Sequence, residues 1–127
     1  MNLFEIAAQT PPVAAKLRAL GKGRVVFAHV AEAAHAFVAG LVAARAKGTG
    51  KKTRRAWVVA PTIRAQEALH NELLNWHPEA IFLPEVEIVL TENALPDPEI
   101  AADRLQALEQ VRASEGALVV LTAAALN

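Results

Sequence analysis

Short apolar runs alternate along this chain with longer segments whose hydrophobic residues recur at helical spacing. The short runs, typical of buried strands, are residues 24–28, 56–60, 80–83 and 118–121, with a weaker run at 87–90. The segments with helical spacing are 31–46, 62–76 and 97–116. This alternation predicts an α/β fold: an open, mostly parallel sheet with flanking helices.

Start and stop signals agree with these boundaries. Pro11 and Pro12 can open a short helix near the N-terminus, and Gly21 can end it. Thr62 can cap the second long helix. The third begins with Asp97, a capping residue, followed by proline and an acid in the first turn.

Helical spacing also predicts which side of each long helix faces the core. The first stripe is Ala34, Phe37, Val38, Leu41, Val42 and Arg45. The second is Ala65, Leu69, Leu73 and Trp76. The third is Ala101, Leu105, Leu108 and Val111 or Arg112.

The chain of 127 residues, 54% of them hydrophobic, suffices for one compact domain. We expect a helical lead-in at 1–22 and an α/β domain at 23–127. Because the chain stops just after a buried strand, we expect a truncation before an inserted second domain. The absence of cysteine excludes disulfides, thiolate metal sites and thiol catalysis. Neither a signal peptide nor an apolar run of membrane-spanning length is visible, so we expect a cytoplasmic protein without membrane contact.

Charge is distributed unevenly although the net charge is zero. Residues 1–66 carry 11 Lys/Arg and 2 acids, a balance of +9, whereas residues 67–127 carry 2 Lys/Arg and 11 acids, a balance of −9. Complementary faces within one fold are the plainer interpretation. A partner-binding surface of one sign is the sharper alternative.

A segment that imitates a phosphate-binding loop lies at 48–53, with the sequence Gly-Thr-Gly-Lys-Lys-Thr. A working loop has the pattern G-x-x-x-x-G-K-[ST] between a strand and the following helix. Here Arg45 stands in place of the first glycine, Lys52 in place of the hydroxyl that binds Mg²⁺, and the segment follows a helix. We therefore interpret it as a basic loop.

The true phosphate-loop position is the turn after the first predicted strand, which contains His29, Val30, Ala31 and Glu32. It offers no glycine for close backbone approach and no lysine to neutralise phosphate. We predict a degenerate phosphate loop, with no catalytic residue, no metal and no bound cofactor in this segment. His29, Glu32 and His35 would spread too widely on a helix to share one ion. His70 and His77 are interpreted as surface or packing residues.

Two charged clusters remain as candidates. The basic cluster spans 45–55, and its possible nucleic-acid contacts are Lys51, Lys52, Arg54 and Arg55. It contains no aromatic residue to stack a base, and the strand pattern is expected to bury nearby Trp57 or place it at an edge. A solvated loop is the favoured interpretation. The acids at 85, 87, 92, 97 and 99 are likewise interpreted as a solvated acidic loop, since no nucleophile accompanies them.

Taken in order, several segments resemble helicase-like domains of the excinuclease B type. They are the degenerate phosphate-loop turn, the Trp-Val-Val-Ala-Pro-Thr segment at 57–62 with its helix, and the segments 82–87, 96–108 and 117–126. Over about residues 22–127 the chain is most similar to the excinuclease-B-like N-terminal module of bacterial transcription-repair coupling factors (the Mfd family). That module lacks a functional phosphate loop, which agrees with the turn described above.

The resemblance implies scaffolding rather than catalysis in this segment. It implies a parent protein with an ATP- and Mg-dependent DNA translocase that displaces RNA polymerase stalled at DNA damage and recruits excinuclease A for nucleotide excision repair. It assigns no partner-binding residue here. Two alternatives stay open: a fragment of an ATP-dependent excinuclease B or helicase-type repair enzyme, and a nucleic-acid-binding domain that uses the basic loop.

Overall fold

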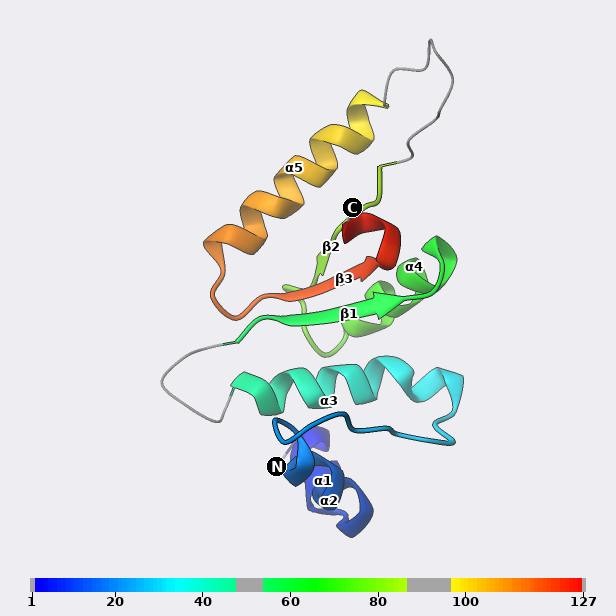
Figure 1. Ribbon diagram of the computed structural model, residues 1–127, viewed down its shortest axis with the longest axis vertical. Helices are drawn as coiled ribbons and strands as arrows, with labels where there is room; N and C mark the ends of the chain where they lie inside the picture. Colours follow the sequence, from blue (N-terminus) through cyan, green and yellow to red (C-terminus); the bar gives the residue numbers. More distant parts are fainter. Residues whose placement is uncertain (1, 48–53, 87–96, 127) are drawn as a thin grey trace.

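The computed structural model describes residues 2–47, 54–86 and 97–126 and has an α/β architecture (Figure 1). Three parallel strands form an open sheet in the order β1-β3-β2. The strands are β1 (Ala56–Ala60), β2 (Ile81–Phe82) and β3 (Leu118–Thr122). The predicted open parallel sheet is therefore confirmed.

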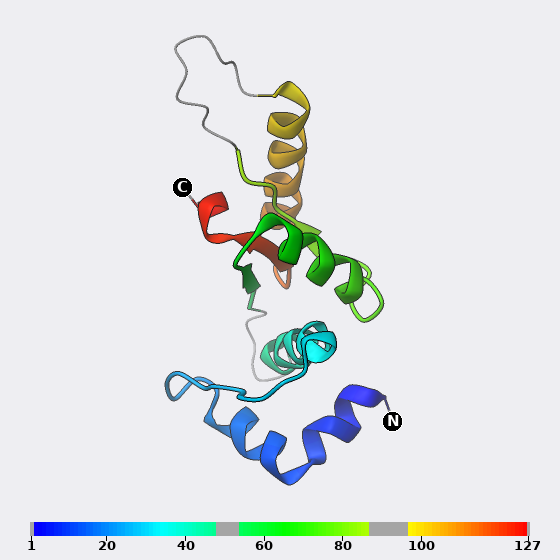
Figure 2. The same ribbon diagram turned by 90° about the vertical axis from the view of Figure 1, so that its right-hand side faces the viewer.

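Helices cover both faces of this sheet and add an outer layer (Figure 2). On one face lie α3 (His35–Lys47) and α4 (Ile63–Leu73), and on the other lies α5 (Pro98–Ala113). The outer layer, on the far side of α3, consists of α1 (Leu3–Gln9) and α2 (Pro11–Ala19). Two short 3₁₀ turns complete the described elements: η1 (Glu32–Ala34) and η2 (Ala123–Leu126).

The central strand β3 is buried along its whole length. Val119 and Leu121 face α5, while Leu118 and Val120 face α3 and α4. The hydrophobic run in the sequence is continuous because both faces of this strand are covered by helices. The core is thus two apolar layers that share β3.

The predicted strand at 24–28 was wrong, because these residues have no strand partner in the structure. The segment lies on the outer side of α3, away from the sheet, and Val26 is 56% exposed. The ammonium group of Lys16 donates to the carbonyl of Val26 and lies 5.7 Å from the ring centroid of Phe27. These contacts attach the segment to α2 instead of to the sheet.

The helix start signals are confirmed. The hydroxyl of Thr62 accepts a hydrogen bond from the N–H of Ala65 at 3.1 Å, and the carboxylate of Asp97 accepts one from the N–H of Glu99 at 2.9 Å. Helix α2 begins at Pro11, as predicted. The preceding helix α1, with a capping box between Asn2 and Glu5, was not predicted. The expected short strand at 87–90 lies outside the described residues.

The predicted inner face of α5 was wrong at Ala101, Leu105 and Leu108 and right at Val111. Leu105 is 60% exposed and Leu108 is 41% exposed, whereas Ala107 and Val111 are buried against β3. Leucine outweighs alanine in a hydrophobicity pattern, but small Ala107 permits a close approach of the helix to the sheet. The side chain of Arg104 fixes this rotation by donating to the carbonyls of Pro84 at 2.8 Å and Ala125 at 2.7 Å.

Helix α3 is buried on two sides rather than along the single predicted stripe. Ala36 and Ala43 face the sheet. On a neighbouring side, the ring of Phe37 packs against that of Phe4 on α1 at a centroid distance of 5.1 Å, and a Cβ atom at Gly40 would lie 3.0 Å from Phe4. The helix is therefore sandwiched between the sheet and α1, which explains its alanine-rich sequence.

We predict a clear contrast between two leucines. Leu121→Ala removes a fully buried side chain of β3 and should lower the free energy of unfolding by about 2–5 kcal/mol. Leu105→Ala, the matched exposed control on α5, should change it by less than about 0.5 kcal/mol. Urea denaturation followed by circular dichroism measures both. An equal loss in the two variants would contradict the observed rotation of α5.

Candidate functional site

Open parallel α/β sheets bind ligands beyond the carboxyl ends of their strands. In this chain a cavity of about 450 Å³ occupies that position after β1. Residues from the turn before α3 and from one face of α4 meet there. Its lining is Val30, Glu32, His35, Pro61, Ala65, Ala68, Leu69 and Glu72. We refer to this cavity as the carboxyl-end crevice.

The predicted degenerate phosphate-loop position lies at this crevice, but its local structure differs from that of a phosphate loop. The preceding segment is not a strand of the sheet. His29 adopts a left-handed conformation with φ 59°, and the imidazole Nε2 of His35 lies 3.2 Å from the carbonyl oxygen of Val30. The His35 side chain thus contacts the backbone of this turn, whereas a phosphate loop presents its backbone N–H groups to a ligand.

The charge of the carboxyl-end crevice is also unsuited to phosphate. Glu32 and Glu72 both line it, and its lining within the described residues includes no lysine or arginine. A carboxylate at the start of a helix stabilises the helix dipole and repels an anionic ligand at the same place. The sequence identified Glu32, but Glu72 joins it only through the packing of α4 beside α3.

Metal coordination by the histidines finds no support in the geometry of the described part of the chain, where no cluster of three His, Cys, Asp or Glu side chains forms. His77 is 8% exposed and packs near Gly40, with its Nε2 3.2 Å from the Gly40 carbonyl oxygen. His70 contacts the carbonyl oxygen of Ala80 and the ring of Phe82. The interpretation of both as packing residues is confirmed.

A second polar cluster lies at the carboxyl ends of β2 and β3. The buried amide of Gln66 donates to the carbonyls of Leu83 at 2.8 Å and Val120 at 3.0 Å, while its Oε1 atom has no hydrogen-bond partner. Beside it, the hydroxyl of Thr122 donates to the carboxylate of Glu85. This cluster ties α4 to two strands. No sequence signal distinguishes Gln66, because an amide side chain on a helix fits the pattern equally well whether it is exposed or buried.

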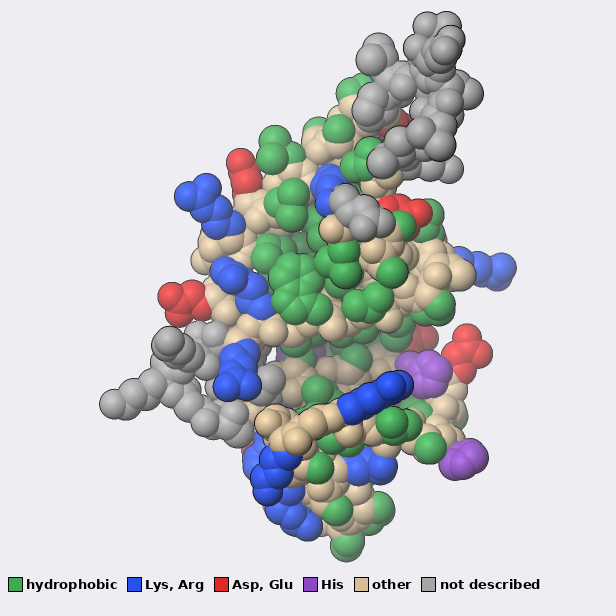
Figure 3. Space-filling view, viewed as in Figure 1, with side chains coloured by type: hydrophobic (Ala, Val, Ile, Leu, Met, Phe, Trp, Pro, Cys, Tyr) green, Lys and Arg blue, Asp and Glu red, His purple; other side chains and the backbone are tan. Residues whose placement is uncertain are grey.

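The basic residues gather at the opposite, amino end of the sheet (Figure 3). Arg45 on α3 and Arg54 before β1 line a pocket of about 430 Å³ there together with Arg18 on α2. Arg55 is engaged elsewhere, since its Nε donates to the carbonyls of Val111 and Ser114, both at 3.2 Å. It thereby satisfies the C-terminal end of α5. The predicted contacts Lys51 and Lys52 lie outside the described residues.

An apolar surface covers the α5 side of β1. Trp57 is 48% exposed and Val59 is 53% exposed, and both project to the α5 side because they pair in register with Val119 and Leu121. The placement of Trp57 at an edge is therefore confirmed. Figure 3 shows hydrophobic side chains gathered over β1 and along α5. Surfaces of this kind are typical of protein–protein contact sites.

Comparison with protein-family models, curated proteins and solved structures finds no match to the chain. In the described ranges, the helices are all too short or too polar to cross a membrane.

We predict that the Gln66 hydrogen bonds contribute measurably to stability. Gln66→Leu should lower the free energy of unfolding by about 1–3 kcal/mol, because the Leu83 carbonyl loses its buried donor. Gln110→Leu on the exposed side of α5 is the matched control and should be near neutral. Chemical denaturation provides the measurement. A more stable Gln66→Leu variant would show instead that the unpaired Oε1 atom dominates.

Proposed function

We propose that this domain is a non-catalytic, helicase-like interaction module of the transcription-repair coupling factor type. In this role it supports the recruitment of excinuclease A to RNA polymerase stalled at DNA lesions, and it works in the cytoplasm. ATP and Mg are then bound by the parent protein beyond this segment, and the parent protein also binds DNA. The proposal rests on the sequence resemblance and on the character of the carboxyl-end crevice.

One observation carries the proposal: the place where this architecture ordinarily binds phosphate is lined by Glu32 and Glu72. Two carboxylates at that position repel a nucleoside triphosphate, which itself carries several negative charges. The fold is then used for its surfaces rather than for hydrolysis.

The exposed side chains of β1 support an interaction role. Trp57 and Val59 are exposed on the α5 side of β1. The exposed side chains of Leu105 and Leu108 extend this apolar surface along α5. Aromatic residues surrounded by aliphatic ones dominate the binding energy of many protein interfaces. A protein partner would cover this surface on binding.

The alternative is an ATP-dependent excinuclease B or helicase-type repair enzyme, and nucleotide binding separates the two. We predict no Mg²⁺-dependent binding of a non-hydrolysable ATP analogue up to about millimolar concentration by isothermal titration calorimetry. Lys51→Ala is the informative variant, because Lys51 is the lysine of the phosphate-loop imitation. Micromolar, Mg²⁺-dependent binding that Lys51→Ala abolishes would contradict the proposal.

The interaction role has its own test in the full-length protein that carries this segment. Trp57→Ser should weaken its complex with purified excinuclease A by roughly tenfold in surface-immobilised binding assays. Ile63→Ser, at 47% exposure on α4, is the matched control and should bind normally. Unchanged affinity in the Trp57→Ser variant would contradict a role for the apolar surface over β1.

A further inference from the structure

The pocket at the amino end of the sheet brings together guanidinium groups from three separate parts of the chain. Arg18 comes from α2, Arg45 from α3 and Arg54 from the residue pair before β1. Its volume is about 430 Å³, and its remaining lining is Leu17, Leu20, Gly21 and Val42. We refer to it as the arginine pocket.

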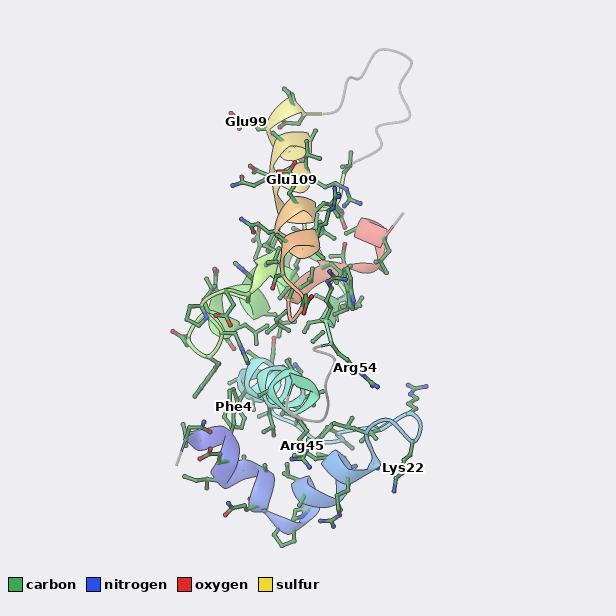
Figure 4. The ribbon with its side chains drawn as sticks, turned by 90° about the vertical axis from the view of Figure 1, so that its left-hand side faces the viewer. Phe4, Lys22, Arg45, Arg54, Glu99 and Glu109 are labelled. Carbon is green, nitrogen blue, oxygen red and sulfur yellow. The ribbon has the colours of Figure 1, made fainter. Side chains whose placement is uncertain are left out.

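Figure 4 shows how these side chains lie. Arg54 extends from the start of β1 and Arg45 from α3 toward the layer that holds α2, and Lys22 stands near the same end of the molecule. The labelled acids Glu99 and Glu109 lie on α5 at the far end. The two labelled acids therefore lie away from the labelled basic residues.

The arginines of this pocket are unengaged, in contrast to several other basic residues. Lys16, Arg55 and Arg104 each donate to backbone carbonyls and thereby hold segments together. Within residues 2–47, 54–86 and 97–126, Arg18, Arg45 and Arg54 have no hydrogen-bond or ion-pair partner. Their charges are available to a ligand.

Nearby negative charge does not cancel the arginine pocket. The carbonyl ends of α2 and α3 point to this end of the molecule, and each helix contributes about half a negative charge there. Three guanidinium groups outweigh that sum. Glu5, which shares a neighbouring cavity with Arg45 and accepts the N–H of Asn2 at 2.9 Å in the capping box of α1, adds one negative charge and leaves the balance positive.

We propose that the arginine pocket binds the phosphate backbone of duplex DNA. Guanidinium groups match phosphate oxygens in charge and in planar, two-pronged geometry. The pocket lining is aliphatic and contains no aromatic ring for a base to stack on, which favours backbone contact with a duplex over a stacked single strand. Recognition of this kind is independent of base sequence.

This assignment goes beyond the proposed protein-interaction role and does not rest on it. The arginine pocket lies at the amino end of β1, whereas the carboxyl-end crevice lies at the opposite end. The 13 residues of α3, about 20 Å of helix, separate the two. The proposed partner surface, formed by Trp57 and Val59, lies on the α5 side of β1, whereas Arg18 and Arg45 come from helices on the other side of the sheet.

The experiment measures fluorescence anisotropy of a labelled 20-base-pair duplex with the whole chain at several salt concentrations. Each phosphate contact contributes about −0.9 to the slope of log K against log salt. Arg45→Ala with Arg54→Ala should weaken binding roughly tenfold and reduce the steepness of that slope by about 2 units. Arg64→Ala with Arg112→Ala removes the same charge from α4 and α5 and should leave the slope unchanged.

One further variant and two further ligands separate the effect of charge, of strandedness and of ligand class. Arg45→Lys retains the charge and should preserve most of the slope. No duplex binding at low salt, or an equal loss in the two double variants, would overturn the proposal. Tighter binding of a single strand of equal length would overturn the duplex assignment. Binding of heparin but not of DNA would do the same for the nucleic-acid assignment.

Discussion

The structure depends on the double pairing and double burial of β3. This strand forms parallel hydrogen bonds with β1 on one side and β2 on the other, and every residue from Leu118 to Thr122 is buried. Backbone groups inside an apolar layer must be paired, so the two short neighbours are held in register by β3. The helices on both faces, and the two charged pockets beside them, take their positions from this strand.

A consequence of the parallel arrangement is that the two ends of the sheet differ chemically. All three strands point the same way, so the segments before β1 collect at one end and the turns after it at the other. In this chain the amino end holds Arg45 and Arg54, and the carboxyl end of β1 holds Glu32 and Glu72. The pockets at the two ends of β1 are thus lined by side chains of opposite charge.

Much of the fold was predictable from local chemistry. The strands at β1, β2 and β3 and the helix starts at Thr62 and Asp97 follow from apolar runs and capping side chains. The expected strand at 24–28 was wrong because a run rich in valine is equally compatible with an extended segment packed on a helix. The inner face of α5 was predicted correctly at Val111 but wrongly at Leu105, because leucine outweighs Ala107 by hydrophobicity while close packing selects the smaller side chain.

The amino-acid sequence by itself determined the α/β class, the parallel sheet, the absence of cysteine chemistry and the charge contrast between the two halves. Only the tertiary structure decided which charges meet. Arg18 joins Arg45 and Arg54 although 36 residues separate the first from the last, and Arg55 turns away to bind carbonyls of α5. The reason is physical: local pattern sets periodicity and caps, whereas the neighbours of an exposed charge depend on how distant helices pack around one buried strand.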